Sequence, residues 1–296
     1  MAARDWFWVI LLGAIWGCSF LFNAVLIREI DPLWVSALRV GVGMLGCWAV
    51  FFAMGKSLPR GVLVYAQMLL LGIIGYTIPF ALFPLSQMHL ASGVAAIINA
   101  LTPITTVIVS HFWPGGERAT MLKSAGVVAG FGGAALLALP ALQSGGTSQL
   151  WAIGACLLAT LCYAVSLNYT RRFVRMDPTT IATLALTGAT LAGIPLAFAA
   201  HGAPVITRPE TVGAALGIGL VATTFGFMIM YRLLPRIGAT NFTTVTFIAP
   251  VSAIILGVTL LGERLLPSHF LGMAAIFLGL LLIDGRIVRR WRGARA

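Results

Sequence analysis

Ten long apolar stretches constrain the fold of this 296-residue chain more than any other feature. Each has about the 20 residues that an α-helix needs to cross a bilayer. Only 9% of the residues are charged, against roughly 25% in soluble domains, which argues against a soluble enzyme. None of the stretches shows the sustained alternation of a β-barrel strand. The predicted fold is an all-α integral membrane protein with helices at 6–27, 33–54, 62–86, 91–113, 121–142, 149–171, 179–200, 211–234, 240–261 and 267–287.

The basic residues predict the orientation of these helices. If the N-terminus is cytoplasmic, most of the 19 Lys and Arg residues fall in cytoplasmic segments, and only Arg28, Arg208 and Arg264 fall in outer loops. This bias predicts a multi-pass protein of the cell inner membrane with both termini in the cytoplasm. A net charge of +11 can also indicate nucleic-acid binding, but the aromatic residues lie in the apolar spans and not among the basic ones. The expected partners are the lipid bilayer and a small-molecule substrate, with no nucleic acid and no required oligomer.

The two halves of the chain carry matching motifs at nearly the same spacing. Asp-Pro opens the second and seventh spans, Glu-Arg follows the fourth and ninth, and a proline lies within the fourth and ninth. The residues are Asp31-Pro32 and Asp177-Pro178, Glu117-Arg118 and Glu263-Arg264, and Pro103 and Pro250. Because each half holds an odd number of helices, the second half enters the membrane in the opposite orientation.

The predicted domains are therefore residues 1–146, the first five-helix repeat, and residues 147–296, the second repeat with a basic cytoplasmic tail. Inverted repeats of this kind are typical of transporters, whose substrate site lies near the membrane midplane between the halves.

Further motifs extend the comparison to nearly the whole chain. They are Ile15-Trp16-Gly17-Cys18-Ser19-Phe20, Leu38-Arg39, Ala91-Ser92 through Leu101-Thr102-Pro103, Gly116-Glu117-Arg118, Ala239-Thr240 through Ala249-Pro250, and Gly262-Glu263-Arg264-Leu265. With these motifs the chain resembles the EamA family of the drug/metabolite transporter superfamily, and within it the YddG-type amino-acid exporters. The resemblance implies a ten-helix carrier of small metabolites that often exports amino acids or toxic compounds. The sequence departs from the pattern at Cys162-Tyr163, which stand where the first half has Trp16-Gly17.

The sequence carries no motif of the common hydrolases, metalloproteases or P-loop enzymes. Its four cysteines lie inside apolar stretches, form no Cys-x-x-Cys pair and belong to no Cys/His cluster at metal spacing. We therefore expect no catalytic residue, no cofactor and no metal.

Polar and aromatic residues inside the spans predict the substrate path, because polar groups in lipid are costly and tend to face a cavity. They recur at helical spacing in the third and fourth spans, and the repeat predicts partners in the eighth and ninth. The predicted substrate-binding residues are Trp16, Asn23, Tyr76, Phe80, Phe83, Asn99, Thr102, Tyr163, Thr224, Tyr231, Thr243 and Thr246. Each polar residue could instead bond to its own helix or tie two helices together.

Three further residues are candidates for hinges or for a gate of the substrate path. Pro103 and Pro250 occupy matching positions, and we expect hinges there, with a fixed kink as the alternative. Arg39 lies roughly 10 Å inside the outer end of the second span. A structural or gating role is expected for it, with the side chain reaching outward to Glu29 or Asp31; binding of a substrate carboxylate is the alternative.

The predicted function is a transporter, not an enzyme, that exports small metabolites, in particular neutral or aromatic amino acids, by alternating access. One alternative is a multidrug exporter of organic cations, which aromatic faces can hold. All eight acidic residues lie at span ends, however, so the predicted cavity has no carboxylate. A further alternative is an intramembrane enzyme or receptor.

Overall fold

The computed structural model describes residues 2–285, apart from the side chains of residues 239 and 240. The predicted basic tail beyond residue 285 lies outside this part of the chain. The described residues form helices and no strand. The elements are α1 (Ala3–Leu26), α2 (Pro32–Ala53), α3 (Val62–Gly72), η1 (Ile73–Thr77), α4 (Ile78–Gln87), α5 (Ser92–Asn99), α6 (Thr102–Phe112), α7 (Met121–Ser144), α8 (Thr147–Thr170), η2 (Arg171–Phe173), α9 (Pro178–His201), α10 (Pro209–Leu216), η3 (Gly217–Phe225), α11 (Gly226–Phe242), α12 (Thr244–Leu261) and α13 (Pro267–Asp284).

Within the described residues, these elements form 10 segments that are long and apolar enough to cross a membrane. Six are single helices, and four are built from more than one element: α3–η1–α4, α5–α6, α8–η2 and α10–η3–α11. Each coincides with a predicted span to within a few residues at its ends. The predicted ten-helix fold is confirmed.

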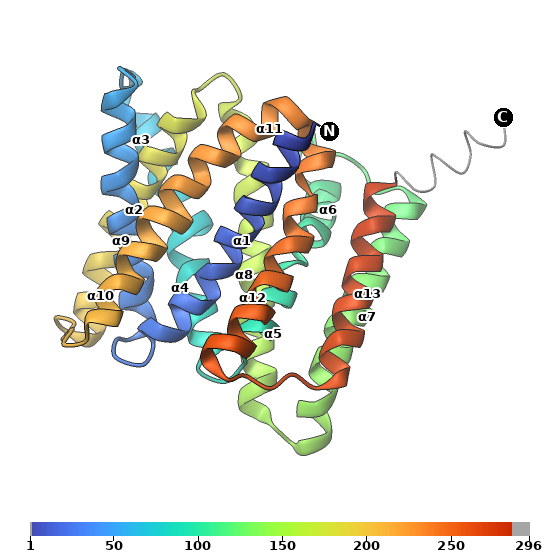
Figure 1. The fold of residues 1–296 in the computed structure, drawn as a ribbon. Coiled ribbons are helices and arrows are strands. Elements are labelled where there is room, and N and C mark those ends of the chain that lie inside the picture. The colour runs from blue at the N-terminus through green and yellow to red at the C-terminus, as the bar shows by residue number, and fades with distance from the viewer. Residues whose placement is uncertain (1, 286–296) are drawn as a thin grey trace, which may run out of the picture.

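The helices run between two ends of the bundle. Helix α1 begins and α13 ends at the upper end in Figure 1, which we name the terminal end; the turn between α7 and α8 marks the opposite, distal end. Helix α8, the repeat counterpart of α1, begins at the distal end. The two counterparts therefore run in opposite directions, as an inverted repeat requires.

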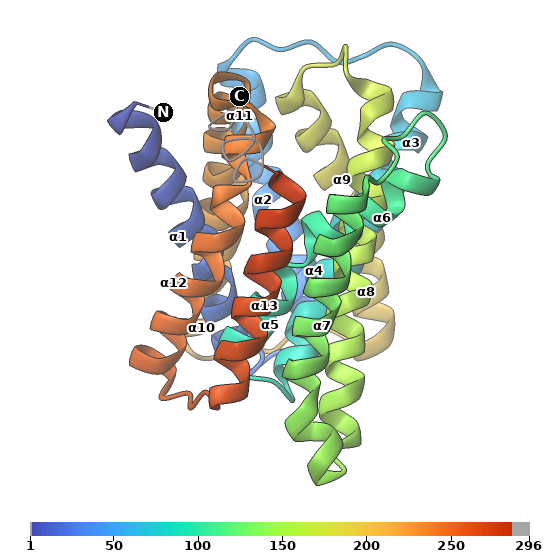
Figure 2. The ribbon, with the colours of Figure 1, turned by 90° about the vertical axis from the view of Figure 1, so that its right-hand side faces the viewer.

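Helices of one half pack against helices of the other. Helix α1 lies along α12, and in the mirrored contact α8 lies along α6. Helices α2 and α9 form a pair between the halves, while α7 and α13 form a separate pair at the edge (Figures 1 and 2). The interface between the halves therefore runs through the interior of the bundle.

Glycines bring α7 and α13 into backbone contact. A Cβ atom on Gly126 would lie 2.6 Å from the carbonyl oxygen of Gly279, and one on Gly133 would lie 2.6 Å from that of Gly272. These distances leave no room for a side chain. The small residues let the two backbones approach as membrane helices commonly do.

The Asp-Pro motif of each half begins a helix and ties it to its partner. The side chains of Asp31 and Asp177 cap α2 and α9 by accepting a hydrogen bond from the backbone N–H two residues on, at 2.8 and 3.0 Å. His201 lies 3.2 Å from Asp31 at the distal end, and Lys56 lies 2.8 Å from Asp177 at the terminal end. Polar contacts therefore join the α2–α9 pair at both ends.

Candidate functional site

Six aromatic side chains from both halves meet in the interior of the bundle. This aromatic cluster consists of Tyr76, Phe80 and Phe83 from the third span, Tyr163 from α8, and Phe227 and Tyr231 from α11. Neighbouring ring centroids lie 5.6 to 6.4 Å apart. Five of the six are residues that the sequence predicts; Phe227 is the addition. A molecule bound against these rings would touch both halves.

Three tyrosine hydroxyls add polar groups to the aromatic cluster. Tyr76, Tyr163 and Tyr231 are partly exposed although they lie inside spans. None of their hydroxyls bonds to another described residue, and none is sealed from solvent. A phenol can both donate and accept a hydrogen bond. Aromatic walls with a few accessible polar groups are typical of small-molecule sites.

Two π-helical segments shape the spans that carry this cluster. Segment η1 contains Tyr76, and η3, at the corresponding position of the other half, contains Thr223 and Thr224. Pro79 follows η1, and its ring would clash with a carbonyl of the preceding turn in a regular helix, which favours the wider turn. In η3, the two threonine hydroxyls donate to carbonyls five residues earlier, at 2.9 and 3.2 Å. Such segments occur frequently at functional sites.

Arg39 of α2 reaches into the aromatic cluster. Its Cζ lies 3.7 Å from the centroid of the Phe80 ring. Its Nε donates a hydrogen bond to Thr223 Oγ1 at 3.2 Å. The guanidinium group therefore bridges α2, α4 and η3 and lies where the two halves meet.

The expected outward pairing of Arg39 is wrong. The two candidate carboxylates are engaged elsewhere at the distal end: Glu29 accepts hydrogen bonds from the backbone and hydroxyl of Thr207 at 2.7 and 2.6 Å, and Asp31 pairs with His201. The side chain of Arg39 turns inward instead, where it contacts the face of the Phe80 ring and the hydroxyl of Thr223.

The fourth span is broken beside this region. Helix α5 ends at Asn99, and α6 begins at Thr102, whose hydroxyl donates to the carbonyl of Asn99 at 2.8 Å. The Nδ2 of Asn99 donates to no other described residue, so it is available to a ligand. Pro103 lies in the first turn of α6, where a backbone N–H has no acceptor within the helix. The proline therefore removes no helical hydrogen bond. Pro250 lies inside the continuous helix α12, so the two predicted hinges differ in local structure.

Two predicted site residues on α1 lie at helix contacts. Trp16 contacts the ring of Phe242, with centroids 6.1 Å apart. Asn23 is buried, and its Nδ2 donates to Gln87 Oε1 at 3.0 Å, while Gln87 donates to the carbonyl of Phe20 at 2.8 Å. Asn23 therefore ties α1 to α4.

The predicted threonines of the second half make one contact between helices and one local bond. Thr224 donates to the carbonyl of Gly43 at 3.1 Å and so joins η3 to α2. Thr246 donates to the carbonyl of Thr243 at 2.6 Å, at the start of α12. The structure thus brings together Tyr76, Phe80, Phe83, Tyr163 and Tyr231, and uses Thr224 in the packing of η3 against α2.

Glu263 joins the end of α12 to the start of α5 at the distal end. Its Oε1 accepts hydrogen bonds from the backbone N–H and the hydroxyl of Ser92, each at 2.7 Å, and Oε2 lies 3.4 Å from the backbone N of Gly93. A carboxylate at a helix N-terminus is favoured by the helix dipole as well as by these bonds. This contact joins the ninth span to the fourth.

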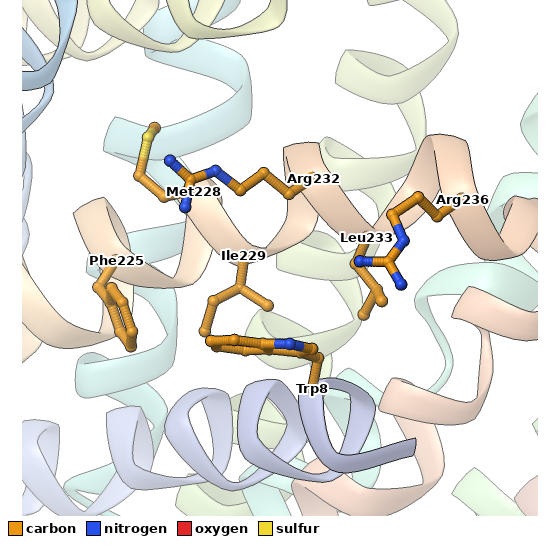
Figure 3. Close-up of a pocket in the computed structure, with 7 residues that line it drawn as sticks. All are labelled: Trp8, Phe225, Met228, Ile229, Arg232, Leu233 and Arg236. Carbon is orange, nitrogen blue, oxygen red and sulfur yellow. The ribbon is translucent and has the colours of Figure 1, made fainter. Parts of the chain in front are cut away.

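A separate groove lies between α1 and α11 near the terminal end (Figure 3). It has a volume of about 160 Å³ and is lined by Trp8, Phe225, Met228, Ile229, Arg232, Leu233 and Arg236. The lining residues that belong to α11 share one face of that helix, and Phe227 and Tyr231 lie on the opposite face. The groove is therefore distinct from the aromatic cluster.

Sequence reasoning missed two parts of this region. Phe227 was missed, although it lies at helical spacing from Thr224 and Tyr231, which is the signal that predicted Phe80 and Phe83. The inward direction of Arg39 depends on Thr223, which is remote in sequence. The glycines and Pro79 near the π segments were the one available signal for an irregular helix.

The chain resembles known transporters over nearly its whole length. The profile of the EamA-like transporter family matches residues 6–139 and 150–284. A probable amino-acid metabolite efflux pump of Escherichia coli (strain K12) is 26% identical over 99% of this chain and 98% of that protein. An uncharacterized transporter of Archaeoglobus fulgidus is 23% identical over 95% of this chain and 98% of that protein.

Two further similarities concern a smaller region and the fold. A probable terminal-alkyne amino-acid exporter of Streptantibioticus cattleyicolor is 25% identical over 70% of this chain and 69% of that protein. A crystal structure with 19% sequence identity matches with a TM-score of 0.68 over 98% of this chain and 99% of that chain. At that identity, the match shows a shared fold.

Proposed function

Because the chain belongs to the EamA-like transporter family, we propose that it exports small metabolites, in particular neutral and aromatic amino acids, by alternating access. Family membership makes it a multi-pass membrane transporter and not an enzyme. The relatives named as an amino-acid metabolite efflux pump and a terminal-alkyne amino-acid exporter support the substrate class.

The observation that carries this proposal is the aromatic cluster between the halves. Its rings can hold an apolar or aromatic side chain, and its accessible tyrosine hydroxyls can bond to the polar end of an amino acid. Asn99 adds an amide at the break of the fourth span. Contributions from both halves are what a carrier needs if a rocking motion is to expose one site to each side in turn.

The contact between Glu263 and Ser92 supports alternating access. It joins α5 to α12 at the distal end, so that end must open for a substrate to leave between these helices. With residues 1–146 and 147–296 as the two moving halves and the terminal end in the cytoplasm, closure of the distal end corresponds to a carrier that is shut on the outer side of the inner membrane.

Counterflow in proteoliposomes tests the proposed function. Vesicles loaded with unlabelled L-phenylalanine or L-leucine should take up the labelled amino acid transiently above the equilibrium level, while protein-free vesicles should not. The same vesicles should show no counterflow of a paraquat-type dication, because Arg39 would repel it from the rings. Counterflow of the dication without counterflow of any amino acid would reject the proposal in favour of an organic-cation exporter.

A further inference from the structure

Among the described residues Arg39 has no carboxylate partner, although it lies in the interior of the bundle. None of the described acidic side chains approaches within 4.0 Å of its guanidinium group. Its protein contacts are the Phe80 ring and the hydroxyl of Thr223. A cation inside a membrane protein is costly unless it is paired, and such residues mark ligand or ion pathways.

Most of the hydrogen-bonding capacity of Arg39 is also unused. A guanidinium group has five N–H donors, and the bond from Nε to Thr223 accounts for one. The donors on both terminal nitrogens bond to no described residue. This is the part of an arginine that binds a carboxylate through two parallel hydrogen bonds.

The surroundings of Arg39 can accept a molecule that carries a carboxylate. Its side chain is partly exposed, as are Tyr76 and Tyr163 of the aromatic cluster. Tyr163 stacks on Phe83 with centroids 6.1 Å apart and meets Phe80 edge-on at 6.4 Å. The positive charge, the accessible hydroxyls and the rings therefore lie side by side.

The second half has no equivalent charge. The repeat counterpart of Arg39 is Ala185, which is fully buried. A Cβ atom on Gly72 would meet the carbonyl oxygen of Ala185, so the backbones of the third and seventh spans touch there. A structural role common to both halves therefore does not account for the arginine.

We propose that Arg39 binds the carboxylate of the transported substrate, with the rest of the substrate lying against the aromatic cluster. This inference rests on the proposed function and names the chemical group that the site requires. The terminal nitrogens donate to the carboxylate oxygens, while Thr223 and the Phe80 ring hold the guanidinium group in place. Asp177, the described carboxylate that acts electrostatically on Tyr231, is paired with Lys56, so a free carboxylate matters more for binding than an amino group does.

Four related probes separate these requirements. They are L-phenylalanine, 3-phenylpropanoate without the amine, L-phenylalaninamide without the free carboxylate, and phenethylamine without any carboxyl group. Binding is measured by thermal shift and by inhibition of labelled L-phenylalanine counterflow. The two carboxylates should bind, and the amide and the amine should bind roughly 10- to 100-fold more weakly, which corresponds to losing hydrogen bonds with a charged partner.

Substitutions of Arg39 test whether its side chain causes the preference for a free carboxylate. Arg39→Gln should weaken carboxylate binding by the same roughly 10- to 100-fold and abolish the preference for acid over amide. Arg39→Lys keeps the charge and should retain part of the preference. Arg175→Gln, on an exposed loop, is the matched control and should bind like the wild type. Elution on size exclusion shows whether each variant folds. If Arg39→Gln does not fold, Arg39→Lys still tests the preference for acid over amide.

The outcomes distinguish this inference from the proposed function. Amino-acid counterflow that phenylalaninamide inhibits as strongly as 3-phenylpropanoate would overturn the role of Arg39 and leave amino-acid export standing. An equal loss of acid and amide binding in a folded Arg39→Gln variant would show a structural role instead. Absence of counterflow for every amino acid, with 3-phenylpropanoate still bound through Arg39, would overturn the substrate class and leave the carboxylate site.

Discussion

Glu263 and Glu117, which occupy equivalent positions in the two repeats, make different contacts. Glu263 binds the backbone and hydroxyl of Ser92 at the distal end. Glu117 is 68% exposed at the terminal end and pairs with Lys123 at 3.0 Å and Arg171 at 3.8 Å. These two basic residues hold the pKa of Glu117 below its usual value, Lys123 having the larger effect. The same motif therefore joins two spans at one end and forms a surface ion pair at the other.

Removing the charge of Glu263 should open the distal end. Hydrogen bonds to a charged group contribute about 1.5–3 kcal/mol, so Glu263→Gln should shift the balance towards the open form roughly 10- to 100-fold. A cysteine at Asn99 serves as the reporter, and its reaction with an impermeant maleimide from the distal side should accelerate. Glu210→Gln, whose carboxylate pairs with no described residue, is the control. Unchanged labelling would mean that Glu263 does not hold this end shut.

Small changes at the candidate site should weaken substrate binding. Asn99→Ala should reduce L-phenylalanine affinity roughly 10- to 100-fold if the amide contacts a charged group of the substrate. Tyr76→Phe, which removes only a hydroxyl, should reduce it about 3- to 10-fold. Leu63→Ala, at a 70% exposed position of the same span as Tyr76, should have no effect. Folded variants that all bind like Leu63→Ala would place the site elsewhere.

The contact between α7 and α13 should tolerate no side chain at Gly126. Gly126→Val places atoms against Gly279 and Ile283, and such overpacking costs about 1–3 kcal/mol. Gly132, on the same helix, has nothing within 4 Å of an added Cβ, so Gly132→Val controls for the change in helix propensity. The thermal midpoint in detergent should fall for Gly126→Val and much less for Gly132→Val. Equal midpoints would contradict the close approach of the two helices.

Glu29 should make stability depend on pH at the distal end. The hydrogen bond from the Thr207 hydroxyl, helped by the Thr211 side chain and by the backbone N–H groups of Thr207 and Arg208, lowers the pKa of Glu29 from 4.5 to about 2. A lowered pKa means that the carboxylate stabilises the fold above pH 4.5 and loses this effect as the pH falls towards 2. The difference in thermal midpoint between wild type and Glu29→Gln should therefore be larger at pH 7 than at pH 3. A difference that grows on acidification would contradict this assignment.

Chemical labelling should report the orientation in the membrane. The positive-inside pattern predicts that the terminal end lies in the cytoplasm. A cysteine at Ser148, at the distal end, should react with an impermeant maleimide in intact cells, whereas one at Ser57, in the loop after α2, should react only after permeabilisation. Both positions are exposed, and the wild type with its own four cysteines sets the background. The reverse pattern would invert the topology and the assigned direction of transport.

The sequence by itself determined the helical framework. Apolar segments of bilayer length must be helices that satisfy their own backbone hydrogen bonds, so the ten spans followed from length and hydropathy. Local capping chemistry determined where α2 and α9 begin, because Asp31 and Asp177 bond to backbone groups only two residues away. Helical spacing also predicted that Tyr76, Phe80 and Phe83 share a face.

Only the tertiary structure decided what the polar groups do. Asn23 and Asn99 look alike in sequence, yet Asn23 uses its amide on Gln87 while Asn99 keeps its Nδ2 free of the described residues. Arg39 turns inward because Thr223, from the other half of the chain, lies within reach. Such partners are far apart in sequence and meet only when the two halves pack, and whether a polar side chain ties helices or faces a substrate depends on that packing.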